Sequence, residues 1–289
     1  MNPVVPKARN VFRIGAYQGP PKTESFESNA RHTRAVLAAA HRQGVDFACV
    51  PECFLTGGCL TTDELRAGAV PATSRRFRDF VRSCAFGDMV SIVGFTERRE
   101  TKLHNTAAIV HRGKLIGLHR KSVPGGLYDK EANTFVSDFH AFRARGVTFG
   151  VIICFEGFFV EPALLVAEQG ARIIFEPHYS FIPMQGMDWQ RQRVRTSRAA
   201  RAVENDCWYV KSNVSIEPMR KIAGAEGFGY GDSFILDNIG RPIAEAGLFK
   251  IGWITADVPK KELTCERESR VGLAPLETCR QMVRLYRTK

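Results

Sequence analysis

The feature that most constrains this chain is the alternation, from one end to the other, of short apolar runs and amphipathic segments. The runs with the length of buried strands are residues 12–17, 46–50, 89–95, 147–154, 173–176 and 208–212. Helical spacing of apolar residues follows Ser25 or Ser28, either of which can cap the helix, and recurs at 74–84, 161–169 and 188–204. Gly170 is placed to end the third of these helices. Alternating strands and helices predict an α/β fold.

Two hairpin signatures refine that prediction. Arg112-Gly113 separates apolar runs at 105–111 and 114–119, and Asn238-Ile239-Gly240 separates runs at 232–237 and 242–246. The pattern alone predicts a doubly wound parallel sheet, but hairpins favour mixed sheets, each with a face that another sheet must cover. No linker-like stretch divides the chain, so we predict a single domain over residues 1–289.

Composition limits the classes of function. No apolar run approaches the roughly 18 to 20 residues of a membrane span, and the first 15 residues lack a secretory pattern, so we expect a cytoplasmic protein with no membrane partner. The eight cysteines are scattered without a CxxC pair, and the seven histidines form neither HxH nor HExxH. We therefore expect free thiols and no metal site.

The net charge of +11 raises the question of an acidic partner. Its densest cluster lies in the helix predicted at 188–204, where Arg191, Arg195 and Arg198 share one face. No aromatic platform or nucleic-acid motif accompanies them, so we predict no nucleic-acid binding. We interpret the cluster as a solvated or intersubunit face. The alternative is attraction of an anionic substrate, to which Arg191, Arg195 and His178 would contribute.

Three reactive side chains follow predicted strands. Glu52 lies in VPECFLTGG, Lys121 in LHRKSVPGG and Cys154 in GVIICFEGFF, and strand ends are where α/β proteins gather their sites. Each alone is weak, because a single cysteine is usually core and a single Glu or Lys is usually surface. Together they form a chemical unit. A thiol needs a base to become a nucleophile, and a cation can stabilise the oxyanion that forms after attack.

These segments resemble the nitrilase superfamily of carbon–nitrogen hydrolases, whose triad is Glu, Lys and Cys in that order. The resemblance extends to four further motifs and covers roughly residues 10 to 286. They are His104-Asn105-Thr106-Ala107-Ala108 with Gly113-Lys114, Arg201-Ala202-Val203-Glu204-Asn205, Gly231-Asp232-Ser233-Phe234-Ile235, and Arg284-Leu285-Tyr286. Chance agreement of so many motifs in order is very improbable.

The resemblance implies a four-layer α-β-β-α sandwich with two mixed β-sheets, assembled as a homodimer or higher homo-oligomer across the sheet-covering helices. It implies cleavage of a C–N bond through a Cys154 thioester, with release of ammonia or an amine and without a cofactor. It also implies that Glu131, the one glutamate between Lys121 and Cys154, orients the lysine. The Phe155 N–H is expected to share the oxyanion with Lys121.

The substrate is less constrained. Many amidases of the family have Tyr-Asp after the cysteine and nitrilases have Trp-Glu, whereas this chain has Phe155-Glu156. We predict a small linear amide or carbamoyl substrate, contacted by Phe155, His178 and Tyr128. The alternatives are a nitrilase that converts a nitrile to an acid, and a non-catalytic basic binding protein with a vestigial site. The vestigial reading is disfavoured because all four family positions are intact.

Overall fold

Two six-stranded sheets form the centre of the computed structural model, which describes residues 9–22, 25–57, 62–125, 139–222 and 225–264. The first sheet has the order β14 (Gly252–Pro259), β1 (Val11–Gln18), β2 (Phe47–Cys49), β3 (Val90–Arg99), β4 (Lys102–His111) and β5 (Lys114–Arg120). The second has the order β13 (Pro242–Glu245), β12 (Phe234–Leu236), β9 (Trp208–Asn213), β8 (Ile173–His178), β7 (Val147–Val151) and β6 (Phe142–Ala144). A separate hairpin pairs β10 (Ser215–Ile222) with β11 (Ala225–Tyr230).

Both sheets are mixed, as the hairpins predicted. In the first, β1, β2 and β3 are parallel, and the strands beyond them are antiparallel. In the second, β7, β8 and β9 are parallel, flanked again by antiparallel strands. The purely parallel sheet that the pattern alone predicted is therefore wrong, because each half of the chain closes its sheet with hairpins.

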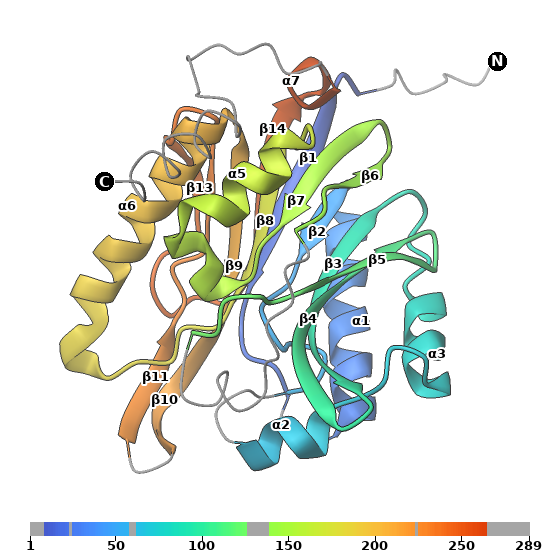
Figure 1. The fold of residues 1–289 in the computed structure, drawn as a ribbon, viewed down its shortest axis with the longest axis vertical. Coiled ribbons are helices and arrows are strands. Elements are labelled where there is room, and N and C mark those ends of the chain that lie inside the picture. Colours follow the sequence, from blue (N-terminus) through green and yellow to red (C-terminus); the bar gives the residue numbers. More distant parts are fainter. Residues whose placement is uncertain (1–8, 23–24, 58–61, 126–138, 223–224, 265–289) are drawn as a thin grey trace, which may run out of the picture.

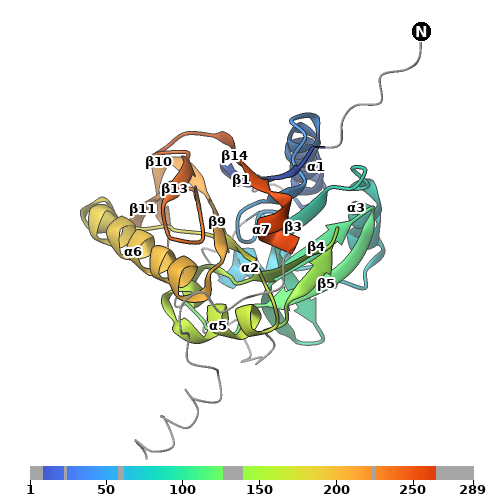
Figure 2. The ribbon, with the colours of Figure 1, turned by 90° about the horizontal axis from the view of Figure 1, so that it is seen from above.

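Helices cover the outer face of each sheet. They are α1 (Phe26–Arg42) and α3 (Arg75–Ser83) on the first sheet and α5 (Val160–Glu168) and α6 (Met187–Asn205) on the second. The structure also describes α2 (Thr62–Gly68), α7 (Lys260–Thr264) and the 3-10 helices η1 (Cys154–Phe158) and η2 (Met184–Gly186). Figures 1 and 2 show α1 and α3 on one side of the molecule and α5 and α6 on the other.

The buried apolar residues confirm the four layers. One cluster joins the inner faces of the two sheets, with Phe47 of β2 stacked on Phe175 of β8 at 6.1 Å between ring centroids. A second cluster packs α1 and α3 on the first sheet, and a third packs α5 and α6 on the second. Three apolar interfaces between four layers are what an α-β-β-α sandwich requires.

Local sequence explains several element ends. The Ser25 hydroxyl accepts a hydrogen bond from the Ser28 N–H and so begins α1. Arg112 and Gly113 both have positive φ, which suits the tight turn between β4 and β5. Gly170, with φ +92°, follows the end of α5 as predicted. Among the described residues, no helix is long and apolar enough to cross a bilayer.

The basic face of α6 differs from the prediction. Arg198 is fully buried and pairs with Glu176 of β8, while Arg191 and Arg195 both pair with Asp232. The interpretation as a solvated or intersubunit face is therefore wrong for Arg198. Helical periodicity could not predict this contact, because the partner carboxylate lies on a strand of the sheet. Because Arg195 also pairs with Glu245, two carboxylates balance Arg191 and Arg195, which therefore add little net charge to attract an anionic substrate.

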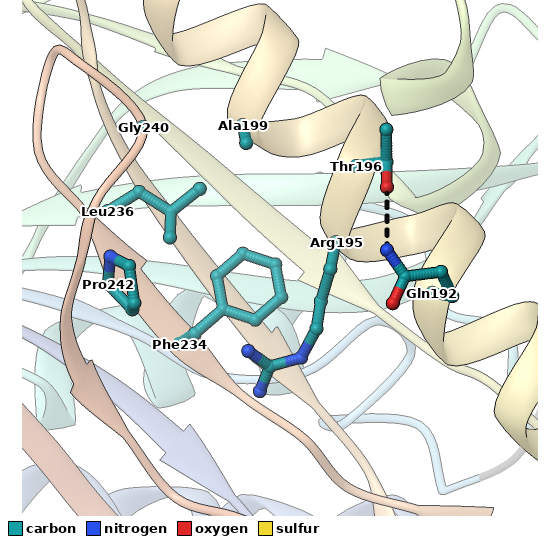
Figure 3. A pocket seen from close by; sticks show the side chains of 8 residues that line it. All are labelled: Gln192, Arg195, Thr196, Ala199, Phe234, Leu236, Gly240 and Pro242. Carbon is teal, nitrogen blue, oxygen red and sulfur yellow. Dashed lines mark hydrogen bonds between the residues drawn. The ribbon is translucent and has the colours of Figure 1, made fainter.

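The same face of α6 borders a surface cavity. Figure 3 shows this cavity of about 240 Å³, which lies between α6 and the β12–β13 hairpin and is partly walled by Arg195, Phe234 and Pro242. None of the predicted reactive residues lines it.

Candidate active site

The predicted reactive side chains lie where strands of both sheets end. Glu52 comes three residues after β2, and Cys154 comes three residues after β7. Lys121 directly follows β5, and His178 is the last residue of β8. Glu52 and Lys121 both lie close enough to Cys154 to change the pKa of its thiol. The structure therefore brings these side chains of the two sheets together.

A glycine contact places the backbone of Glu52. A Cβ at Gly94 of β3 would lie 2.5 Å from the Pro51 carbonyl oxygen and 2.8 Å from Cα of Glu52. Only glycine lets the chain after β2 pass this close to β3. The Leu55 N–H then donates to the Gly94 carbonyl at 3.0 Å and fixes the turn that carries Glu52.

Lys121 and Asn105 hold the Glu52 carboxylate. Lys121 Nζ lies 2.8 Å from Glu52 Oε1, and both side chains are almost fully buried. The side-chain Nδ2 of Asn105 donates to the same oxygen at 2.5 Å, while the backbone carbonyl of Asn105 accepts from the backbone N–H of Lys121 at 2.8 Å. Asn105 thus aligns both partners of a buried ion pair, a role that sequence analysis did not assign to it.

Cys154 is the first residue of η1 and has a left-handed backbone, with φ of 50°. Burial raises the pKa of its thiol well above the ordinary value, and the negative charge of Glu52 adds to that rise. Lys121 and a backbone hydrogen bond from Tyr179 oppose it. At neutral pH the resting side chain is therefore a thiol, which must lose its proton to become a nucleophile.

Glu156 connects the Cys154 turn to the end of β5. Its carboxylate accepts from the Ile153 N–H and the Ser122 N–H, each at 2.6 Å, and lies 2.8 Å from His119 Nε2. Ile153 precedes Cys154, and Ser122 follows Lys121. One fully buried carboxylate therefore sets the spacing between the thiol and the lysine.

Glu176 is the centre of a second buried network behind the thiol. Its carboxylate pairs with Arg198 at 2.5 Å, with His178 Nδ1 at 2.6 Å and with the Tyr209 hydroxyl at 2.5 Å. Burial alone would raise the pKa of Glu176, but Arg198 and His178 hold it well below its usual range. Glu176 therefore remains a carboxylate.

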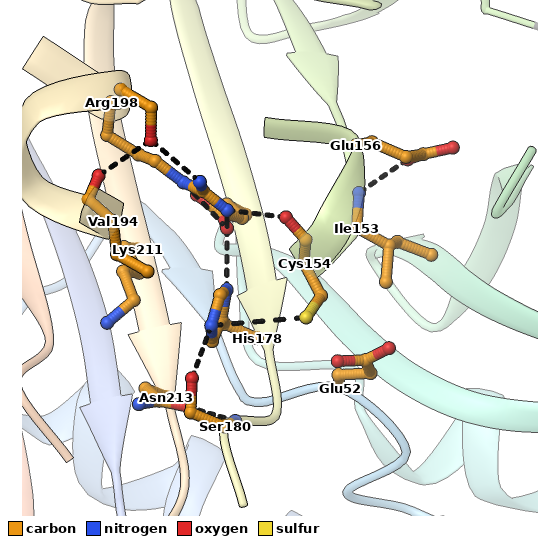
Figure 4. Close-up of polar contacts among 12 residues, drawn as sticks. Glu52, Ile153, Cys154, Glu156, His178, Ser180, Val194, Arg198, Lys211 and Asn213 are labelled. Carbon is orange, nitrogen blue, oxygen red and sulfur yellow. Dashed lines mark hydrogen bonds and ion pairs between the residues drawn. The ribbon is translucent and has the colours of Figure 1, made fainter. Parts of the chain in front are cut away.

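His178 lies between this network and Cys154, as Figure 4 shows. Its Nε2 is 3.9 Å from Cys154 Sγ and 2.7 Å from the Ser180 hydroxyl, and burial lowers its pKa to about 3 despite the opposing effect of Glu176. The imidazole is thus neutral at pH 7. With its Nδ1 proton directed to Glu176, Nε2 is an acceptor beside the thiol.

The other predicted residues divide into two groups. Phe155 lies in η1, where its ring packs against Phe158 and Phe159 at 5.5 and 5.4 Å. Glu131 and Tyr128 lie outside the described residues, as do Cys59, Cys265, Cys279 and the Arg284-Leu285-Tyr286 motif. Within the described residues, no group of three or more His, Cys, Asp or Glu side chains is arranged to hold a metal ion.

Comparison with known proteins gives the family. The carbon-nitrogen hydrolase family model matches residues 13–265. The chain belongs to the carbon–nitrogen hydrolase family. The sequence of this carbon–nitrogen hydrolase is 28% identical over 239 residues to N-carbamoylputrescine amidase of Solanum lycopersicum, covering 78% of this chain and 79% of the relative.

Two further matches agree. Omega-amidase NIT3 of Saccharomyces cerevisiae is 28% identical over 242 residues, which cover 76% of this chain and 78% of the relative. The crystal structure of a carbon-nitrogen hydrolase from Helicobacter pylori G27 superposes with a TM-score of 0.76 at 19% identity, over 96% of this chain and 95% of that one. The structural match shows that the two proteins share this fold.

Sequence analysis missed the positions that orient the predicted residues. Asn105 and Glu156 were visible only as parts of the hairpin motif and of the segment after the cysteine. Glu176 and Arg198 were visible only as single charges in an apolar strand and a basic helix. A charged residue in a run of buried strand residues, as in IIFEPH, is the one signal that predicts a buried partner.

Proposed function

We propose that this carbon–nitrogen hydrolase cleaves a small linear amide or carbamoyl compound through a thioester on Cys154. Glu52 accepts the thiol proton, and Sγ attacks the carbonyl carbon. Lys121 and the Phe155 N–H stabilise the oxyanion. The tetrahedral intermediate then expels ammonia or an amine, which takes the proton from Glu52. Water, deprotonated by Glu52, adds to the thioester, and the acid leaves as Cys154 regains its proton.

One observation carries this proposal. A carboxylate and an ammonium group form a buried pair 2.8 Å apart, and both act electrostatically on the same half-buried thiol. The thiol has a raised pKa and needs a base, and Glu52 is a carboxylate beside it. Lys121 supplies the positive charge for the oxyanion. We include Glu131 in the proposal as the residue that orients Lys121.

The relatives favour the substrate class. Their names refer to an omega-amide and to N-carbamoylputrescine, both linear compounds with a terminal amide or carbamoyl nitrogen. A nitrilase of Pyrococcus abyssi is also similar, at 28% identity over 178 residues, so nitrile hydrolysis is the second candidate. We further propose that residues 1–289 form one domain that acts in the cytoplasm as a homodimer or higher homo-oligomer on a small-molecule substrate, without a cofactor.

The test is ammonia release from a panel of linear amides, carbamoyl compounds and nitriles, with Cys154→Ala compared to the parent. We expect Cys154→Ala to lose turnover by at least about 10⁴-fold, as loss of a nucleophile does. Cys84→Ala is the matched control, because Cys84 is equally a free thiol but is buried under α3. Activity of Cys154→Ala within about tenfold of the parent would exclude the covalent route.

A second comparison separates the two glutamates. Glu52→Gln removes the proton acceptor and is expected to be nearly as inactive as Cys154→Ala. Glu131→Gln keeps a hydrogen-bonding group and should retain more activity. Parent-like kcat in Glu131→Gln would remove Glu131 from the proposed site.

A further inference from the structure

The peptide between Cys154 and Phe155 is held from one side. Arg198 Nη2 donates to the Cys154 carbonyl oxygen at 2.5 Å. Figure 4 shows this oxygen turned toward Arg198, on the opposite side of Cys154 from Glu52. In a trans peptide the C=O and the N–H point in opposite directions. The same contact therefore directs the Phe155 N–H away from Arg198, toward the side on which Glu52 lies.

Within the part of the chain that the structure describes, the Phe155 N–H has no competing acceptor. The next N–H, that of Glu156, bonds to the Ile153 carbonyl at 3.1 Å, and the Ile153 N–H bonds to the Glu156 carboxylate. Among the hydrogen bonds of the described residues, none starts from the Phe155 N–H. Phe155 is only partly buried, and an open donor beside a nucleophile is suited to bind a substrate oxygen.

The φ of Cys154 does not set the orientation of the 154–155 peptide. A φ of 50° lies in the left-handed region, which costs a non-glycine residue about 1 to 2 kcal/mol. This φ is the rotation about the N–Cα bond of Cys154 and belongs to the 153–154 peptide, so the 154–155 peptide can still turn through the ψ of Cys154 and the φ of Phe155. Such a rotation would turn the carbonyl toward the substrate and the N–H away from it.

Arg198 is well suited to prevent that rotation, because it is itself immobile. It is fully buried, bonds to Glu176 through Nε and Nη2, and lies 4.2 Å from the Phe158 ring centroid. Burial opposes its charge, but Glu176 raises the pKa of Arg198 above its ordinary value. The guanidinium is therefore charged and fixed at any working pH. Gly157 leaves room for it, since a Cβ there would lie 2.7 Å from Arg198 Cζ.

We propose that Arg198, anchored by Glu176, is a positioning residue that holds the Phe155 N–H in the orientation that binds the oxyanion. This inference rests on the proposed thioester mechanism and adds to it the residue that orients one of its two oxyanion donors. Arg198 does not touch the substrate. Arg198 acts on the oxyanion only by fixing the orientation of the peptide between Cys154 and Phe155.

The test compares two reactions of the same thiol. Amide hydrolysis forms an oxyanion. Alkylation by iodoacetamide does not, because sulfur displaces iodide from a saturated carbon and forms an S–C bond directly. Arg198→Lys keeps the positive charge beside Glu176 but removes the guanidinium fork. We expect kcat to fall about 10²- to 10³-fold, as for the loss of one oxyanion donor, with the alkylation rate of Cys154 within about threefold of the parent.

A second variant displaces the guanidinium without removing it. Gly157→Ala places a methyl group against Arg198, and we expect the same split between kcat and alkylation. Arg193→Lys is the matched control, because Arg193 also lies 4.2 Å from the Phe158 ring but is exposed and has no contact with the Cys154 carbonyl. Its kcat should equal that of the parent.

The outcomes are distinguishable. An unchanged kcat in Arg198→Lys or Gly157→Ala would overturn the inference. An equal loss of kcat and alkylation would also overturn it, because Arg198 would then support the nucleophile or the fold instead of the peptide. If Arg198→Lys does not fold, Gly157→Ala decides, since it keeps both the arginine and Glu176 in the chain. Turnover by Cys154→Ala would instead contradict the thioester mechanism itself.

Discussion

Replacing Glu156 with glutamine should separate two parts of the site that a single carboxylate now joins. The carboxylate accepts two backbone N–H bonds of 2.6 Å, from Ile153 and Ser122, and lies 2.8 Å from His119 Nε2. A carboxamide has one oxygen, so its NH₂ group must face one of these N–H donors. The group is fully buried, and no water can replace the lost acceptor.

The size of the effect follows from these contacts. Hydrogen bonds to a charged group contribute about 1.5 to 3 kcal/mol each, and an unpaired buried N–H costs about 1 to 3 kcal/mol. One bond is lost and two are weakened, so we expect Glu156→Gln to lower the free energy of unfolding by about 3 to 5 kcal/mol. Urea denaturation followed by circular dichroism measures this directly.

The matched control is Glu27→Gln, because the Glu27 carboxylate is 60% exposed and lies 3.9 Å from Arg76, whose side chain is 47% exposed. Surface pairs contribute about 0 to 1 kcal/mol, so this variant should be close to the parent. Since Glu156 also spaces Cys154 from Lys121, kcat of Glu156→Gln should fall at least about tenfold under conditions where the protein is folded. A loss of stability no greater than that of Glu27→Gln would refute the reasoning.

Three further predictions concern single positions. Gly94→Ala should lower kcat at least about tenfold, because the added Cβ would displace the backbone of Glu52, and should change the reactivity of the Cys154 thiol little. Steady-state kinetics measure kcat, and iodoacetamide alkylation measures the reactivity of the thiol. A parent-like kcat would contradict this prediction. In Glu52→Gln, iodoacetamide should alkylate Cys154 faster than in the parent at neutral pH, because Glu52 raises the pKa of the thiol, while turnover is lost. Alkylation slower than in the parent would count against this prediction. Burial lowers the pKa of Lys211 to about 8 from 10.5, so the unfolded chain binds this proton more tightly and stability should rise by about 2 kcal/mol from about pH 7.5 to 9.5. Urea titrations of the parent and Lys211→Met at both pH values test this, and an equal rise in both would refute the role of Lys211.

The elements that the sequence predicted are those with local causes. Strands β7 and β8 are runs of mainly apolar residues. Ser25 caps α1 through the Ser28 N–H, and Gly113 permits the turn between β4 and β5. Glu52, Lys121 and Cys154 were identifiable because each follows such a run. Their mutual proximity was predicted through the family resemblance, since strand order is not a local property.

The partners of the site were not predictable in the same way. Arg198 looked like one cation of a basic helix, because its burial depends on Glu176, which lies on a strand reached through a separate segment of chain. Glu156 looked only like a variant of the second residue after the cysteine. Its partner could not be predicted, because the Ser122 N–H that it binds follows β5 of the other sheet. The β10–β11 hairpin was missed because its residues show neither a clear alternation nor a turn signal.

The left-handed backbone of Cys154 has a consequence for engineering this scaffold. Glycine is the residue that adopts a φ of 50° without strain, so Cys154→Gly should gain up to about 1 kcal/mol of stability while deleting the nucleophile. A selection that rewards thermal tolerance alone would therefore enrich inactive descendants at this codon. Libraries aimed at a more robust catalyst need to keep the codon fixed, or to score ammonia release in the same round.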